Sequence, residues 1–242
     1  MGVFKTMSIA SELAKLQTNL INSYVAVENK GGSLPSNLGY DNLPTSISSI
    51  NTTLNVSAVG SPTINGTVVS GFSTSNYLDT FLMFNLDSTY SPTQSWEQQF
   101  KITTGSSFPQ YERITGTRTD KKGGAYIVLH YGHVGVWMTT NNTSWDIADG
   151  SQSSEALTLN KTYWIRMSKP VASQNNYVVT LSEDGSNFTQ LFSVTASTSN
   201  PVKSTQETTI GCGSGNFPFQ GSIDLSECYI KVGDVYLWKG CV

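Results

Sequence analysis

The sequence predicts a mainly β protein, an antiparallel sandwich or jelly roll, preceded by a short helical segment. From about residue 63 onward, short apolar runs alternate with clusters of Gly, Asn, Asp and Ser that are typical of turns. No helical pattern separates these runs, and strands that follow one another without helices pair antiparallel and pack as two sheets. A single pattern of helical period stands in front of them. We therefore expect a helical attachment or oligomerisation segment over residues 1–55 and a β domain over residues 56–242.

The first segment is predicted to be a helix over residues 8–29. Ser8 is a suitable N-cap, and the stretch KGG that follows the segment is a suitable stop. The apolar residues recur with the spacing of a coiled-coil seam: Ile9, Leu13, Leu16, Leu20 and Val27. A helix that packs on a sheet usually has a wider apolar face, so this narrow line favours contact with copies of itself, as in a trimer, or with a larger assembly. Packing against its own β domain is the alternative.

A second, shorter helix is expected after a polar linker. Asp41 could cap it, and Leu43, Ile47 and Ile50 would then line one face.

The predicted strands follow, joined by hairpin turns at Asn65-Gly66, at Gly132-His133 and within residues 183–186. They lie in the stretches TINGTVVSGF, NYLDTFLMFNL, WEQQFKITT, AYIVLHY, VGVWMTT, TYWIRMS, YVVTLSEDGSNFTQLFSV and CYIKVGDVYLWKG. A sandwich needs large side chains between its sheets, and Trp96, Trp164 and Trp238 are expected there.

Charge and cysteine content exclude several classes of function. Only 13% of residues are charged and the formal net charge is −3, so no positive field is available to hold nucleic acid or an anionic membrane. The longest apolar cluster, FLMF, is too short to cross a bilayer. No secretory signal is visible, so we expect synthesis in a cytoplasm. Cys212, Cys228 and Cys241 are expected to be buried thiols rather than disulfides or zinc ligands.

Three stretches of the chain resemble structural proteins of bacteriophages that infect gut and related bacteria. SELAKLQTNLINSYVAVENKGGSLP with NLPTSISSI is similar to their N-terminal segments. VVSGFSTSNYL with SWEQQFKITTG is similar to the first strands of their concanavalin A-like, laminin-G-like domains. SWDIADGSQ, LTLNKTYWIRM, YVVTLSEDGSNF and GSIDLSECYIKVGDVYLWKG continue the likeness to the C-terminus, so that it covers nearly everything except residues 106–124.

The resemblance implies a concanavalin A-like jelly roll displayed on a virion, as a component of the tail, the baseplate or a head fibre. It implies a role in binding host-surface glycan, with other virion proteins and copies of itself as partners. A capsid decoration or spacer without a ligand is the structural alternative, and a glycan hydrolase is the enzymatic one.

Catalysis is tested first at the stretch SIDLSE. Concanavalin A-like glucanases carry two glutamates and an aspartate on one strand, which act as nucleophile, acid and helper. Asp224 and Glu227 have matching spacing, but Ser222 stands where the nucleophile would be. His130 and His133 have no nucleophile elbow nearby, and His130 should share the face of its strand with Tyr126 and Val128. We therefore expect no catalytic residues.

Aromatic side chains are the better functional lead, because sugar rings stack on Trp and Tyr while neighbouring amides and carboxylates take their hydroxyls. The residues expected to contact a carbohydrate are Trp137, Trp145, Tyr131, Asp146, Asn141 and Asn142. Asp146 and Asp149 are too few carboxylates for a calcium cage, so neither a metal nor another cofactor is expected. The sequence thus predicts a phage virion protein with a lectin-like domain that adheres to the host surface, located in the virion.

Overall fold

A computed structural model describes the following residues: 9–29, 34–44, 56–85, 95–117, 124–139, 141, 143–169, 176–196, 203–213 and 216–240. The chain divides into two compact units, Met1–Thr53 and Leu54–Val242.

The first unit contains helix α1 (Ile9–Asn29) and the 3₁₀ turn η1 (Tyr40–Asn42). Two tyrosines join the helix to the segment that follows it: the Tyr24 hydroxyl donates to the Gly39 carbonyl at 2.6 Å, and the Tyr40 hydroxyl donates to the Leu16 carbonyl at 2.7 Å. The predicted first helix is therefore confirmed. Of the predicted second helix, the beginning is seen next to η1, and residues 45–50 lie outside the described part of the chain.

The apolar line of α1 has both covered and uncovered members. Leu20 is buried within the chain itself, as is its neighbour Tyr24. Leu13 and Leu16 are 60% and 51% exposed. The side chains of Ile9 and Val27 lie outside what the structure describes. The described part of the seam available to another chain is thus the N-terminal half of α1.

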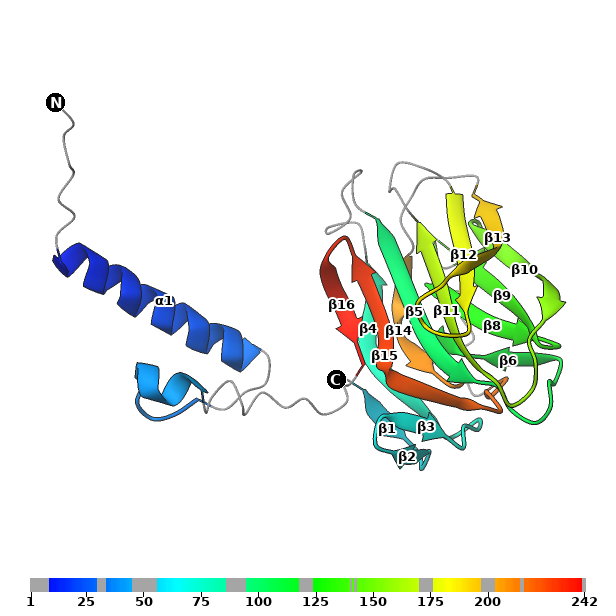
Figure 1. Ribbon diagram of the computed structural model, residues 1–242, viewed down its shortest axis with the longest axis horizontal. Helices are drawn as coiled ribbons and strands as arrows, with labels where there is room; N and C mark the ends of the chain where they lie inside the picture. The colour runs from blue at the N-terminus through cyan, green and yellow to red at the C-terminus, as the bar shows by residue number, and fades with distance from the viewer. Residues whose placement is uncertain are drawn as a thin grey trace. The chain divides into compact units, whose positions relative to one another are not determined.

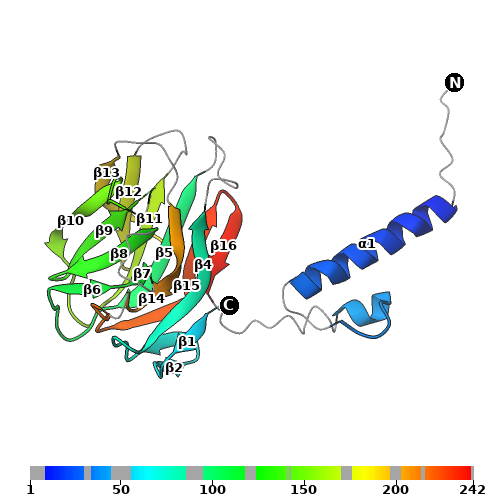
Figure 2. The same cartoon turned by 180° about the vertical axis from the view of Figure 1, so that it is seen from behind.

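The second unit is a sandwich of antiparallel sheets (Figures 1 and 2). One layer is a single large sheet. Its strands, in spatial order, are β13 (Thr189–Thr195), β12 (Asn176–Ser182), β11 (Thr162–Lys169), β5 (Trp96–Thr103), β15 (Ser222–Val232), β3 (Val68–Ser70) and β2 (Thr63–Asn65), with β16 (Val235–Lys239) also paired to β15.

The other layer consists of two four-stranded sheets. The first has the order β1 (Ser57–Val59), β4 (Tyr77–Asn85), β14 (Lys203–Ile210), β7 (Thr115–Thr117). The second has the order β10 (Ala148–Ala156), β9 (His133–Met138), β8 (Ala125–His130), β6 (Tyr111–Arg113). Ile114, between β6 and β7, joins them, because its N–H donates to Ile127 of β8 and its carbonyl accepts from Gly211, which follows β14.

Strand alternation places the core between the two layers. In β11, Tyr163, Ile165 and Met167 are buried, whereas the residues between them are half-buried on the outer face. The predicted antiparallel jelly-roll sandwich preceded by a helical segment is confirmed. Trp96 and Trp238 lie in the core as expected. The prediction for Trp164 is wrong: it alternates with Tyr163 and Ile165 and therefore faces outward.

The three predicted hairpins are also confirmed. β2 pairs with β3 around Gly66, β8 with β9, and β12 with β13. At the turn between β8 and β9, Tyr131 and Gly132 both have positive φ, 50° and 83°, which is the backbone of a type I′ turn. A tyrosine at such an angle is uncommon, and its ring is held out into solvent there, 55% exposed.

Candidate functional site

The outer face of the sheet β10–β9–β8–β6 carries a pocket of about 210 Å³ that is lined mainly by aromatic rings. The lining residues are Tyr111, Arg113, Tyr126, Val128, Trp137, Trp145 and Phe217. Two of them, Trp137 and Trp145, were predicted to bind carbohydrate, and the fold brings them to one pocket.

The floor of the pocket comes from β8. Ile127 and Leu129 point into the core, so Tyr126 and Val128 point to the outer face. Both are nevertheless buried, because side chains from neighbouring segments cover them. Tyr126 meets Trp145 edge-on with ring centroids 5.1 Å apart, and its hydroxyl is hydrogen-bonded to Thr117. This floor is therefore fixed by contacts on both sides.

The indole ring of Trp137 packs against two glycines. A Cβ atom added to Gly135, two residues earlier on β9, would lie 3.2 Å from its indole ring. A Cβ added to Gly150 on the neighbouring strand β10 would lie 2.9 Å from the ring, and Gly150 also has a φ of +76°. A side chain at Gly150 would displace the indole, and one at Gly135 would crowd it, so both glycines leave space for Trp137, which lies half-buried beside the pocket.

Trp145 comes from the loop between β9 and β10. Asn141 shapes this loop, because its Oδ1 accepts from the N–H groups of Thr143 and Ser144 at 2.8 and 3.0 Å. Asn141 thus has a structural role in positioning the loop, rather than an amide aimed at the pocket. Asp146 follows Trp145 and is half-buried. Asn142, also predicted to bind carbohydrate, lies outside the described residues.

Tyr111 and His130 continue the aromatic surface toward the β8–β9 turn. The Tyr111 ring stacks on His130, with centroids 4.4 Å apart, and meets both Trp137 and Phe217 edge-on. His130 Nδ1 lies 2.9 Å from Gln152 Oε1, and its ring is 4.9 Å from that of Tyr131. Tyr131 is therefore one ring beyond the pocket rather than part of its lining. His130 shares the outer face of β8 with Tyr126, as predicted.

Phe217 forms one wall of the pocket and lies far in sequence from the other lining residues. It lies in the loop between β14 and β15, has a φ of +57° and is 42% exposed. Its carbonyl accepts from the N–H of Arg113 at 2.8 Å, and Pro218 forms a parallel bridge with Arg113. The Arg113 guanidinium lies 5.3 Å from the Phe217 ring and 5.4 Å from the Tyr126 ring. Such distances permit cation–π attraction to both rings.

Sequence reasoning missed Tyr111, Arg113 and Phe217. The first two lie in a strand of three residues, too short to show an alternating pattern. A weak signal was present in the composition of Tyr-Glu-Arg, where two large amphipathic residues flank one carboxylate. Phe217 stands in a glycine-rich loop whose partners are about a hundred residues away, and no local pattern marks it.

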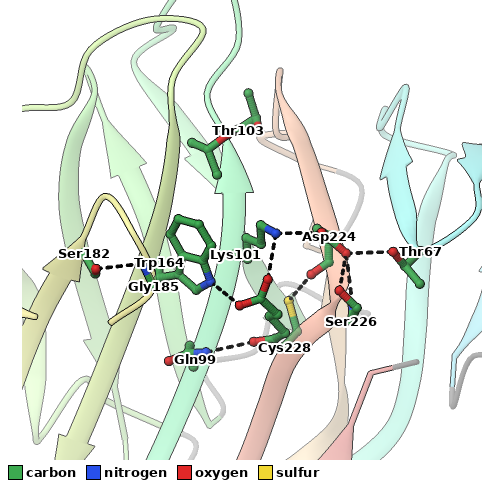
Figure 3. Close-up of polar contacts among 12 residues, drawn as sticks. Thr67, Gln99, Lys101, Thr103, Trp164, Ser182, Gly185, Asp224, Ser226 and Cys228 are labelled. Atoms are coloured by element: carbon green, nitrogen blue, oxygen red, sulfur yellow. Dashed lines mark hydrogen bonds and ion pairs between the residues drawn. The ribbon is translucent and has the colours of Figure 1, made fainter. Parts of the chain in front are cut away.

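A polar cluster lies on the outer face of the large sheet, around Asp224 (Figure 3) and the nearby Glu227. Lys101 on β5 binds both carboxylates, with Nζ at 3.0 Å from Asp224 Oδ2 and 2.7 Å from Glu227 Oε1. The indole N–H of Trp164 donates to the other Glu227 oxygen at 2.7 Å. Thr67 and Ser226 donate to Asp224 Oδ1 at 2.8 and 2.7 Å. Both carboxylates are thus engaged by groups of the protein.

This cluster accompanies a bulge in β15. Pairing with β5 shifts between Asp224 and Tyr229, so that the residues between them lack regular partners. The Gln99 side chain donates to the Glu227 carbonyl at 3.0 Å, and the Cys228 thiol donates to the Asp224 carbonyl at 3.2 Å. Side chains thus supply hydrogen-bond donors to two carbonyl groups of β15 in the stretch where its regular pairing with β5 is interrupted.

The protonation of this pair does not suit glycoside hydrolysis. Burial tends to raise the pKa of Asp224, but hydrogen bonds from Ser226, Lys101 and Thr67 outweigh it and lower the pKa to about 2. The hydrogen bond from Lys101 also lowers the pKa of Glu227. A general acid needs a proton near neutral pH, and neither carboxyl holds one there. Both residues lie on the outer face of β15, where their contacts with neighbouring strands give them a structural role.

Cys212 and Cys228 are buried thiols, as predicted, and burial raises the pKa of the Cys228 thiol well above its ordinary value. Cys241 lies outside the described residues. Within the described ranges, no three His, Cys, Asp or Glu side chains gather as a metal site. In the same ranges, no helix is long and apolar enough to span a bilayer.

No protein-family model matches this chain, and no curated protein matches it. Similar solved structures include the binding domain of botulinum neurotoxin serotype D, with 13% identity, 72% of this chain and 42% of that chain covered, and a TM-score of 0.46. Another is the LG1–3 region of the laminin α2 chain, with 17% identity, coverages of 66% and 32%, and a TM-score of 0.42. A third is a protein of unknown function from Shewanella oneidensis, with 17% identity, coverages of 71% and 73%, and a TM-score of 0.43. The chain spans less than half the length of the toxin and laminin chains.

Proposed function

We propose that this protein is a bacteriophage virion component whose sandwich binds host-surface glycan through the aromatic pocket on the sheet β10–β9–β8–β6. The single observation that carries the binding part is the gathering of Trp137, Trp145, Tyr111 and Phe217 around one opening, from two strands and two loops. The role is adhesion rather than catalysis.

The chemistry of the pocket suits a sugar ring. Pyranose rings present apolar C–H faces that stack on aromatic side chains, and hydroxyl groups at their edges that need polar partners. Indole and phenyl faces are supplied by Trp137, Trp145 and Phe217, and hydrogen-bonding groups by Arg113 and Tyr111. A volume of about 210 Å³ matches one sugar unit, so longer chains would extend along the surface toward Tyr131.

The virion part of the proposal rests on two supports. The first is the resemblance of the chain, from SELAKLQTNL to its C-terminus, to phage structural proteins. The second is the exposed apolar residues on the first half of α1, Leu13 and Leu16, which another virion protein or a second copy could cover. Several copies in one particle would raise a weak affinity for sugar through effective concentration.

The binding proposal is tested on a glycan array with the full-length protein and with Trp137→Ala. Loss of a stacked indole removes roughly 1–3 kcal/mol of binding free energy, so the affinity for any glycan that binds should fall by about 10-fold or more. Tyr236→Ala is the matched control, because Tyr236 is an exposed aromatic residue on β16 in the opposite layer. An array without binders, or equal binding by Trp137→Ala, would favour a spacer without ligand.

The virion proposal is tested separately. Antibodies raised against residues 54–242 should decorate intact phage particles in electron micrographs. Labelling confined to lysate material that separates from particles would contradict the assignment, whatever the glycan array shows.

A further inference from the structure

A row of rings leads away from the pocket along the outer face of β8. The Tyr111 ring lines the pocket and stacks on His130, with centroids 4.4 Å apart. His130 in turn lies 4.9 Å from the ring of Tyr131, which is 55% exposed at the β8–β9 turn. Tyr111, His130 and Tyr131 thus form an aromatic row that begins in the pocket and ends at an exposed ring.

The far end of the aromatic row has a backbone conformation that does not suit a tyrosine. Tyr131 has a φ of +50° in a type I′ turn, where Asn and Gly are the favoured residues. The turn is fixed on both sides, because the Tyr131 N–H donates to the Gln110 carbonyl at 3.1 Å and Gly132 packs on the Phe108 ring. Strained residues that the surrounding structure holds in place concentrate at ligand sites. The fold therefore presents this ring although another residue would fit the turn better.

The sheet places a polar pair beside the aromatic row. Gly135 on β9 is aligned with Val128 on one neighbouring strand and with Gln152 on the other. Because Gly135 has no side chain, Gln152 reaches across β9, and its Oε1 lies 2.9 Å from His130 Nδ1. An imidazole and an amide are thus fixed next to the rings, with the Gln152 side chain exposed to solvent.

Four polar groups on this surface have no hydrogen-bond partner in the part of the chain that the structure describes. They are the hydroxyl groups of Tyr111 and Tyr131 and the indole N–H groups of Trp137 and Trp145. Each is attached to a ring, so the surface offers aromatic faces with polar groups at their edges. A chain of pyranose units offers the complement at every unit, an apolar face with hydroxyl groups around it.

We infer that the ligand is a linear oligosaccharide, with one unit in the pocket and a following unit stacked on Tyr131. This rests on the proposed glycan-binding function and specifies its ligand class, a chain of pyranose units rather than a single terminal sugar. The pocket volume of about 210 Å³ matches one unit, and the aromatic row supplies a second subsite outside it. Affinity should therefore depend on chain length.

The experiment uses a glycan array that carries the mono- to hexasaccharides of cellulose, chitin and amylose. The array also carries the single sugars that terminate branched glycans. The full-length protein is applied to it, and the affinity for each ligand that binds is measured by calorimetry. We expect at least one linear series to bind, with affinity rising about 10-fold or more from the monosaccharide to the trisaccharide.

Two variants test the second subsite. Tyr131→Asn places a favoured residue in the turn, so it should fold and melt no lower than wild type, while it loses the 10-fold gain for the trisaccharide. Its affinity for the monosaccharide should equal that of wild type. Phe81→Asn is the matched control, because Phe81 is also an exposed aromatic residue with positive φ, 59% and 55°, but on β4. Undiminished trisaccharide affinity in Tyr131→Asn, or an equal loss in Phe81→Asn, would overturn the inference.

The outcomes also distinguish this inference from the function on which it rests. Equal affinity for the monosaccharide and the trisaccharide overturns the second subsite and leaves glycan binding intact. The same holds if the protein binds terminal single sugars and no linear series. Absence of binding to every glycan on the array overturns both.

Discussion

Two carboxyl groups of the sandwich have pKa values that move in opposite directions, and their surroundings explain why. Asp224 lies at the surface, where hydrogen bonds and an ion pair lower its pKa to about 2. Glu112 lies fully buried on β6, and burial raises its pKa to about 7, although the hydrogen bond that Glu112 Oε2 accepts from the Gln220 N–H opposes the rise. Its Oε1 has no hydrogen-bond partner among the described residues.

The raised pKa of Glu112 predicts how stability depends on pH. The folded protein keeps the Glu112 proton up to about pH 7, whereas the unfolded chain releases it near pH 4.5. The stabilising contribution of this group is therefore complete below pH 4.5 and is lost as the pH rises through about 7. Glu112→Gln, which keeps an acceptor for the Gln220 N–H, should flatten this part of the profile and be the more stable protein at pH 8.

Urea denaturation of both proteins from pH 4 to pH 8 measures this difference. Glu97→Gln is the control, since Glu97 is a partly exposed carboxyl on the outer face of the large sheet. Parallel profiles for wild type and Glu112→Gln would show that Glu112 ionises normally in the folded protein.

At the scale of elements, the apolar line of α1 is buried within the chain at one end and exposed at the other. Its spacing suggested one continuous seam, but the segment 34–44 lies against the helix and Leu20 is buried within the chain. Leu16 and Leu13, one and two turns before Leu20, stay exposed. A helix of this length is only marginally stable by itself, so the contacts with segment 34–44 contribute directly to its formation.

The contact that Tyr24 makes between α1 and segment 34–44 can be tested by removing its hydroxyl group. Tyr24→Phe removes the half-buried hydrogen bond to the Gly39 carbonyl while the ring stays in place, and should destabilise the first unit by about 1 kcal/mol. Amide hydrogen exchange of residues 16–24 should accelerate about five-fold as a result.

Thr18→Ala serves as the reference variant, because the Thr18 hydroxyl bonds only within its own helix, to Ala14. Unchanged exchange in Tyr24→Phe would mean that the ring alone holds the two segments together.

At the scale of the whole molecule, the chain separates into a helical unit and a sandwich with its own core. The sandwich buries its apolar residues between its own layers, so we expect it to fold independently of the first unit. Attachment and binding would then be divided between the two units.

Removal of residues 1–53 tests this division. The remaining sandwich should melt within a few degrees of the full-length protein and bind a monovalent sugar with equal affinity, because the pocket is built from residues 111–217. Its binding to a densely coated glycan surface should weaken by about 10²-fold or more if the first unit brings copies together.

Light scattering reports the oligomeric state, and surface plasmon resonance reports binding at low and high glycan density. Equal binding of both proteins to the dense surface would contradict a role of the first unit in multivalency.

The parts of the fold that depend on local pattern could be predicted from the sequence, and those that depend on distant contacts could not. Each predicted hairpin has its turn residues between two alternating runs, and so β8–β9 and β12–β13 were found. Trp164 was expected in the core because of its size, but it faces outward because it alternates with Tyr163, Ile165 and Met167. Half of the pocket was missed because Tyr111 and Phe217 meet only after the sheets are assembled.

The backbone hydrogen bond between Arg113 and Phe217 can form only late in synthesis of the chain. One rim of the recognition surface emerges from the ribosome about a hundred residues after the other, and the two are joined through main-chain bonding. A chain terminated before residue 217 would therefore lack the phenyl group that faces the indole rings, and the proposed saccharide pocket would be incomplete. Retention on a sugar-coated resin would thus select full-length, correctly assembled molecules and let truncated ones wash through.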